Sequence, residues 1–153
     1  MKPPAARVTA SLIVLLLLGS AAHAGSAPAS LSCAGKTSTG ALTIKGLIPA
    51  TEESLDLRVT YGGAVAHFKN DGASAKVIED FSKKVFVLIL TDHQTGSDTE
   101  MYAIPDTVRS KGALQASFSA YVTLPRPGLQ RAPAAYDDFL HKARVQCSYR
   151  YEI

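Results

Sequence analysis

The residues best suited to chemistry lie in one short acidic segment, residues 92–100. His93 stands beside Asp92, and Asp98 and Glu100 follow after a glycine. An imidazole next to carboxylates can act in general acid–base catalysis. Oxygen-rich loops of this kind can also hold Ca²⁺, although the spacing differs from that of the twelve-residue calcium loop. The same residue types suit a solvent-exposed hairpin tip, and we favour that interpretation.

Other patterns that carry catalysis or bind metals are missing from the sequence. Residues 72–76 lack the final glycine of a Gly-x-Ser-x-Gly nucleophile motif. No Cys-x-x-Cys or His-x-x-x-His spacing indicates a zinc site. We interpret the paired carboxylates at 52–53 and 137–138 as solvated. We therefore predict no catalytic residue, cofactor or metal. The alternative is a small exported hydrolase or metal-dependent enzyme whose site is assembled from dispersed residues around His93.

Three residues between positions 121 and 131 are of types that dominate binding energy at protein interfaces. Tyr121 falls on the polar side of an alternating segment, and Arg126 and Arg131 lie in a proline-rich stretch, residues 125–133. These residues favour a non-catalytic binding module that holds a protein partner or a small ligand. Inhibition by an exposed loop would be its most specific form. For Tyr121 itself we favour the other interpretation, in which its side chain packs beneath the proline-rich loop or the short helix expected after it.

The elements that must position these residues are strands, because apolar residues recur at every second position. The clearest alternation covers residues 55–61, 114–124 and 143–153. Residues 85–90 are apolar at every position, which predicts a central strand covered on both faces. Weaker strand signals cover residues 31–36, 41–48, 64–69, 75–80 and 100–104.

Short turns separate these segments, and they determine the expected fold class. Gly62-Gly63 suits a two-residue hairpin turn, and residues 70–72 and 95–97 also suit turns. We predict an all-β fold, an antiparallel meander of about eight strands that forms a small barrel or a sandwich. One short helix is expected over residues 134–141, where Pro133 precedes apolar residues at helical spacing.

The two cysteines, Cys33 and Cys147, lie near opposite ends of the predicted domain. Nothing basic close to either of them in the sequence suggests an activated thiolate. In an oxidising compartment they can form only one intramolecular bridge. We predict a structural disulfide that ties the first strand to the last.

The first 24 residues have the three parts of a secretory signal peptide. A positive start, a seven-residue apolar run at 12–18 and the small residues of Ala22-His23-Ala24 predict cleavage after position 24. The run is too short to span a bilayer, which needs about 20 residues. A flexible leader, residues 25–30, and a single β domain, residues 31–153, would follow. The mature chain would be periplasmic or extracellular and would have no membrane span.

The composition fits one ordinary globular domain. The full chain has 153 residues, 46% of them hydrophobic, and a net charge of +3. Without Lys2 and Arg7 that charge falls to about +1, so the basic balance belongs mainly to the predicted signal peptide. We therefore predict no nucleic-acid partner.

Overall fold

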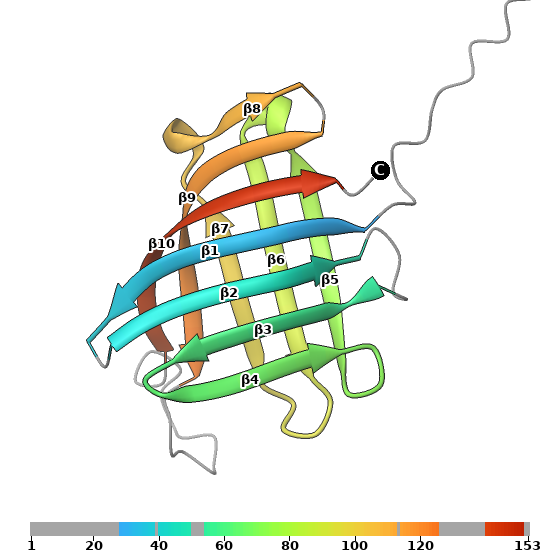
Figure 1. Ribbon diagram of the computed structural model, residues 1–153, viewed down its shortest axis with the longest axis vertical. Coiled ribbons are helices and arrows are strands. Elements are labelled where there is room, and N and C mark those ends of the chain that lie inside the picture. The colour runs from blue at the N-terminus through green and yellow to red at the C-terminus, as the bar shows by residue number, and fades with distance from the viewer. Residues whose placement is uncertain (1–27, 39, 50–53, 113, 126–139, 152–153) are drawn as a thin grey trace, which may run out of the picture.

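Ten antiparallel strands form one sheet that curls into a nearly closed barrel (Figure 1). The computed structural model describes residues 28–38, 40–49, 54–112, 114–125 and 140–151. The single-turn 3₁₀ helices η2 (Phe81–Lys83) and η3 (Pro105–Thr107) lie between strands. In chain order the strands are β1 (Ala29–Thr37), β2 (Gly40–Ile48), β3 (Asp56–Tyr61), β4 (Ala64–Lys69), β5 (Ala73–Asp80), β6 (Val85–Asp92), β7 (Asp98–Ala103), β8 (Arg109–Lys111), β9 (Gln115–Pro125) and β10 (Leu140–Tyr151).

The strand order explains where the barrel fails to close. Neighbouring strands pair in the order β4-β3-β2-β1-β10-β9-β7-β6-β5, and β8 pairs with β9 beside this path. The two ends of the order, β4 and β5, follow each other in the chain, yet they diverge from the turn that joins them. Figure 1 shows β1 to β4 lying across β5 to β7. The predicted all-β antiparallel fold is confirmed, and the barrel form is the one adopted.

The strand count is higher than the expected eight or so, mainly because of β8. This strand has only three residues, all of them exposed, so it has no alternating hydrophobic pattern to detect. β1 begins at Ala29, which pairs with Tyr151 and Ile48. Ala29 and Ser30 therefore belong to the sheet, although they fall in the segment expected to be a flexible leader.

The alternating pattern predicted the core of β9 correctly from Ala116 onward, whereas Leu114, expected on the same face, precedes the strand and is 40% exposed. In β9 every second side chain points inward, and these side chains are at most 2% exposed: Ala116, Phe118, Ala120, Val122 and Leu124. Five aromatic rings meet inside the barrel, with centroids 4.9–6.1 Å apart: Phe81, Phe86, Phe118, Tyr149 and Tyr151. Aromatic pairs at this spacing stabilise a core beyond the area they bury.

The expectation that residues 85–90 are covered on both faces is wrong. In β6 the inward residues Phe86, Leu88 and Leu90 are each 1% exposed. On the other face, Val85 is 37% exposed and Val87 is only partly buried. The barrel has a single layer, so it covers one face of each strand. An apolar face of β6 therefore lies on the outside.

The helix expected over 134–141 lies outside the described residues as far as position 139. Its last two positions are wrong, because Leu140 and His141 begin β10 and pair with Pro125 and Leu124 of β9. The hydrogen-bonded pairing of β9 with β10 extends to the end of β9 and therefore includes these two residues.

The predicted disulfide joins Cys33 of β1 to Cys147 of β10. The two residues are direct cross-strand partners, with Cα atoms 4.1 Å apart. Both are at most 2% exposed, so the bridge belongs to the core. The predicted signal peptide lies outside the described residues. Among the residues that are described, no helix has the length and apolar character needed to cross a membrane.

Candidate functional site

Four exposed or half-exposed side chains form a row across the outside of the barrel. Ile78 of β5 pairs with Val87 of β6, Val87 pairs with Tyr102 of β7, and Tyr102 pairs with Tyr121 of β9. Cross-strand partners project from the same face of a sheet. These four residues therefore make one continuous apolar strip, which we call the tyrosine face.

The two tyrosines are the largest exposed groups of the tyrosine face. Tyr121 is 52% exposed and Tyr102 is 41% exposed. The Tyr102 hydroxyl donates a hydrogen bond of 2.7 Å to Oε2 of Glu100 on the same strand. Ile78 is 48% exposed. Exposed β-branched and aromatic residues in direct succession make a patch rather than scattered apolar atoms, and such patches mark interaction surfaces.

Cations lie near both ends of the row that forms the tyrosine face. Arg144 of β10 is the cross-strand partner of Tyr121. The parallel row beside it runs from Lys76 through Ile89, Glu100 and Thr123 to Lys142. Three cations and one carboxylate thus lie at the ends and along one side of the apolar centre. This arrangement is complementary to a partner surface with an apolar centre and an acidic rim.

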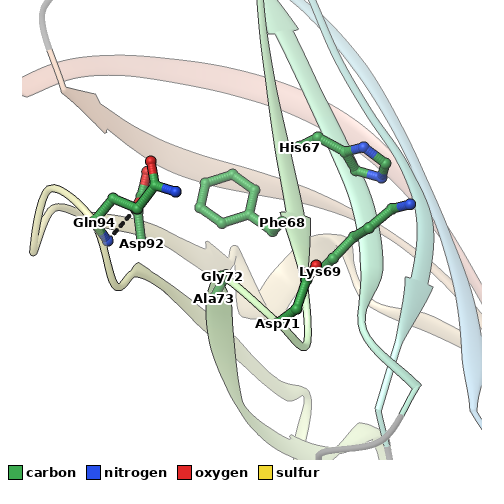
Figure 2. A pocket seen from close by; sticks show the side chains of 8 residues that line it. All are labelled: His67, Phe68, Lys69, Asp71, Gly72, Ala73, Asp92 and Gln94. Atoms are coloured by element: carbon green, nitrogen blue, oxygen red, sulfur yellow. Dashed lines mark hydrogen bonds between the residues drawn. The ribbon is translucent and has the colours of Figure 1, made fainter.

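A separate pocket of about 250 Å³ opens at the corner where β4 and β5 meet. Figure 2 shows the Phe68 ring extending toward Asp92 and Gln94, whereas His67 and Lys69 extend to the opposite side of β4. Phe68 and Ala73 are 6% and 5% exposed, so they form its apolar floor. Its lining residues are His67, Phe68, Lys69, Asp71, Gly72, Ala73, Asp92 and Gln94.

Two groups at this corner are already held by the fold. Nε2 of His67 lies 2.6 Å from Oδ1 of Asp56, and this hydrogen bond holds the pKa of the Asp56 carboxyl below its ordinary value. Oδ1 of Asp92 accepts backbone N–H bonds from Gln94 and Thr95, at 2.8 and 3.2 Å. Asp92 therefore stabilises the turn after β6, and its carboxylate is occupied by that role.

A polar link joins β5 to β10 at the far end of β5. Oε1 of Glu79 accepts a hydrogen bond from the Tyr151 hydroxyl. Burial, followed by hydrogen bonding to Glu79, raises the pKa values of Tyr149 and Tyr151 above the ordinary value of tyrosine. Both phenols are therefore neutral donors at ordinary pH. Oε2 of Glu79 is buried and has no hydrogen-bond partner within the described part of the chain.

The acidic segment around His93 shows no convergent arrangement. His93 is exposed in the turn after β6, and its backbone N–H donates to the Gly72 carbonyl at 3.0 Å. Oδ1 of Asp98 accepts a hydrogen bond from the Thr91 hydroxyl at 2.6 Å. Among the described ranges, no group of three or more His, Cys, Asp or Glu side chains could hold a metal ion.

The sequence pointed to one residue of the tyrosine face and missed the other three. Tyr121 is exposed, as its place in the alternation predicted. Arg126 and Arg131 lie outside the described residues. For Ile78, Val87 and Tyr102, the sequence contains one feature that could have indicated an exposed apolar surface. A strand that is apolar on both faces, in a barrel of one layer, must expose one of them.

Comparison of the chain with models of known protein families gives no match, and no curated protein and no solved structure matches it either.

Proposed function

We propose that this chain is an exported, non-catalytic binding module that holds a protein partner against its tyrosine face. The observation that carries the proposal is the direct pairing of Tyr102 and Tyr121, both exposed, between Val87 and Arg144. Tyrosine and arginine are enriched among the residues that dominate binding energy. An exposed outer face without a cavity suits another protein better than a small molecule.

The interior of the barrel supports a protein partner over an enclosed ligand. Phe86, Phe118 and Leu31 are each at most 1% exposed and belong to one continuous core cluster. Small-molecule sites are concave cavities, usually about 300–1,000 Å³ in volume. The corner pocket, at about 250 Å³, is smaller than that range. The filled core and the small size of this pocket favour the outer face as the binding surface.

Replacing Tyr102 and Tyr121 with serine is the direct test of this proposal. Both side chains are exposed, so the variants should fold, with a loss of stability of about 1 kcal/mol or less from the broken cross-strand pair. Each replacement removes an aromatic anchor worth about 2 kcal/mol or more at an interface hot spot, or about 30-fold in Kd. The measurement is a calorimetric titration of the wild type and each variant with the purified partner, after affinity capture with the wild type has identified it.

The matched control is Lys45→Ser, which changes an exposed residue of β2 that lies outside the tyrosine face. It should leave the Kd within about twofold of the wild-type value, well below a hot-spot effect. Equal affinity of the wild type and the double tyrosine variant would contradict the proposal. A dimer of the isolated chain that dissociates in the double variant would do so as well, because the face would then bind a second copy.

Charge reversal at the rim tests the predicted acidic partner. Lys142→Glu and Arg144→Glu place carboxylates where cations now border Tyr121. Like charges across an interface slow diffusional encounter, so the association rate should fall by about tenfold or more at low salt, and the difference should shrink as salt is added. Stopped-flow or surface-based kinetics give this rate. Faster association of the reversed variants would mean that the partner is basic.

A further inference from the structure

Charge is distributed unevenly around the barrel. The four neighbouring strands β2, β1, β10 and β9 contain no Asp or Glu, whereas β5 contains two, β6 one and β7 two. The predicted mature chain has a net charge of only about +1, so one side of the barrel is basic because the charges are separated. The exposed cations on β10, β1, β2 and β3 are Lys36, Lys45, Arg58, Lys142, Arg144 and Arg150.

One row of cross-strand partners crosses this basic side. It runs through the paired residues Arg109, Ser117, Ser148, Ser32, Lys45 and Arg58, all of them exposed. We call these six residues the serine row. They lie on six strands that Figure 1 shows side by side, from β8 to β3. Neighbouring strands are about 4.8 Å apart, so the row extends over about 24 Å of the sheet.

The three serines of the row have hydroxyl groups that the fold does not use. Ser117, Ser148 and Ser32 form no side-chain hydrogen bond with any other described residue. Serines of the adjacent rows differ in this respect, because the Ser30 hydroxyl donates to the Arg150 carbonyl and the Ser119 hydroxyl to Oε1 of Gln146. Three free hydroxyls therefore lie between one cation at the β8 end of the row and two at the β3 end.

The two cations at the β3 end oppose each other directly. Lys45 of β2 is the cross-strand partner of Arg58 of β3, and like charges in this position destabilise a sheet. Neither forms an ion pair with a described residue. Asp56, the one carboxylate of β3, is hydrogen-bonded to His67 and attracts Arg58 only through space. The pair therefore has an excess of positive charge that a bound anion would neutralise.

The residue types of the serine row define the chemistry of a ligand. Arg and Lys bind carboxylate, sulfate and phosphate groups through charge-assisted hydrogen bonds. A serine hydroxyl both donates and accepts, so it is complementary to the hydroxyl groups of sugars. A polysaccharide that carries acidic groups presents anions and hydroxyls along one extended chain. A row with cations at both ends and no cavity between them suits such a chain better than a small anion.

The side chains that other polyanions would need are missing from this side. The aromatic residues Tyr61, Tyr149 and Tyr151 of β3 and β10 all pack in or against the core. Single-stranded nucleic acids bind through bases stacked on exposed aromatic rings. Helices that lie on membranes insert aromatic or leucine side chains, and a protein reads a DNA duplex with an element that enters a groove. The outward residues of the serine row offer none of these contacts.

We propose that the serine row binds an acidic polysaccharide. Its anionic groups neutralise the Lys45–Arg58 pair at one end and Arg109 at the other, and its hydroxyl groups exchange hydrogen bonds with the three serines. Arg150, in the adjacent row between Ser30 and Gln115, adds positive charge beside the chain. The serine row is separate from the tyrosine face, so neither proposal depends on the other.

The test titrates the purified protein calorimetrically with dextran sulfate, and unmodified dextran is the uncharged control. The wild type should bind dextran sulfate with a Kd below about 100 μM at about 0.1 M salt, should lose affinity as salt is added, and should not bind dextran. Replacing Lys45 and Arg58 together with glutamine should weaken binding at least tenfold. The midpoint of thermal unfolding should not fall, because the substitution removes a like-charge pair.

The matched control replaces Lys76 and Lys84 together with glutamine. Both are exposed residues of the β5–β6 side, so the net charge changes by the same amount while the serine row stays intact. This variant should bind dextran sulfate within about twofold of the wild type. The Tyr102→Ser/Tyr121→Ser double variant should also bind it as the wild type does, which separates this proposal from that of the tyrosine face.

The serines are tested by Ser32→Ala combined with Ser148→Ala. Two lost hydrogen bonds to sugar hydroxyls should weaken binding at least fivefold, whereas Ser74→Ala on β5 should have no effect. Unchanged affinity of the double serine variant would contradict a sugar ligand.

Four other results would overturn the proposal. They are no binding of dextran sulfate by the wild type, equal binding by the Lys45/Arg58 variant and the wild type, and equal losses in the Lys45/Arg58 and Lys76/Lys84 variants. The fourth is tighter binding of duplex DNA or of anionic phospholipid vesicles than of dextran sulfate at the same salt concentration, because the ligand would then be a nucleic acid or a membrane.

Discussion

Replacing Cys33 and Cys147 together with alanine is expected to lower the free energy of unfolding by about 4–5 kcal/mol. The bridge joins residues separated by 114 positions, so in the unfolded chain it closes a loop that contains most of the domain. Such a loop loses much conformational entropy when it is closed. Denaturant titration followed by linear extrapolation measures the effect.

A second measurement separates the crosslink from the packing of the sulfur atoms. Both cysteines are buried, so alanine also removes core volume and adds a cavity cost. The wild type unfolded in the presence of a reductant keeps the sulfur atoms and loses only the bond. The decrease in the free energy of unfolding on reduction should account for most of the decrease seen in the double alanine variant. A decrease of less than about 1 kcal/mol in the reduced protein would mean that the bridge adds little to this fold.

The substitution Gly46→Ala is expected to lower the free energy of unfolding by about 3 kcal/mol or more. Two independent costs meet at this residue of β2. Its φ angle is 144°, which side chains rarely adopt. A Cβ there would also lie 2.9 Å from the Leu57 Cα and still closer to the Asp56 carbonyl oxygen of β3. The backbone of β3 would have to move to make room.

Three further alanine variants separate these costs. At Gly72 neither cost applies, at Gly40 only the positive φ of 135° applies, and at Gly35 only the close approach to β10 applies. Gly72→Ala should change stability by less than about 1 kcal/mol. The Gly40 and Gly35 variants should each lose about 1–3 kcal/mol. Thermal or denaturant unfolding ranks the stabilities of the four variants. A Gly46→Ala protein as stable as the Gly72→Ala protein would contradict this prediction.

Alternation along single strands made most of the core predictable. Phe118 and Val122 lie inward where the period of two places them. This works because one face of each strand meets the core and the other meets solvent. The failure at β6 has the same origin. Val85, Val87 and Ile89 are apolar, and a pattern read from one strand cannot tell whether a second layer covers them.

The tyrosine face shows what strand patterns leave out. Tyr102 and Tyr121 are 19 positions apart and become neighbours only because β7 pairs with β9 in one register. A shift of one residue in that register would move one ring to the core side. Sequence spacing carries no such information across β8 and η3, so Tyr121 could be predicted as a surface residue and its partner could not.

The pairing of β1 with β10 also has a consequence for how the chain encodes the fold. Ala29 and Tyr151 are cross-strand partners, as close as residues on either side of an ordinary hairpin turn. The neighbour relations among the strands thus form a nearly continuous cycle, broken in space between β4 and β5 and not between β1 and β10. Joining Tyr151 to Ala29 by a short linker and cutting the chain at the exposed Gly62-Gly63 turn would keep every strand pair. In the rearranged chain the bridge between Cys33 and Cys147 would close only a short loop. The linker, and no longer the disulfide, would then provide most of the restriction on the conformations of the unfolded chain.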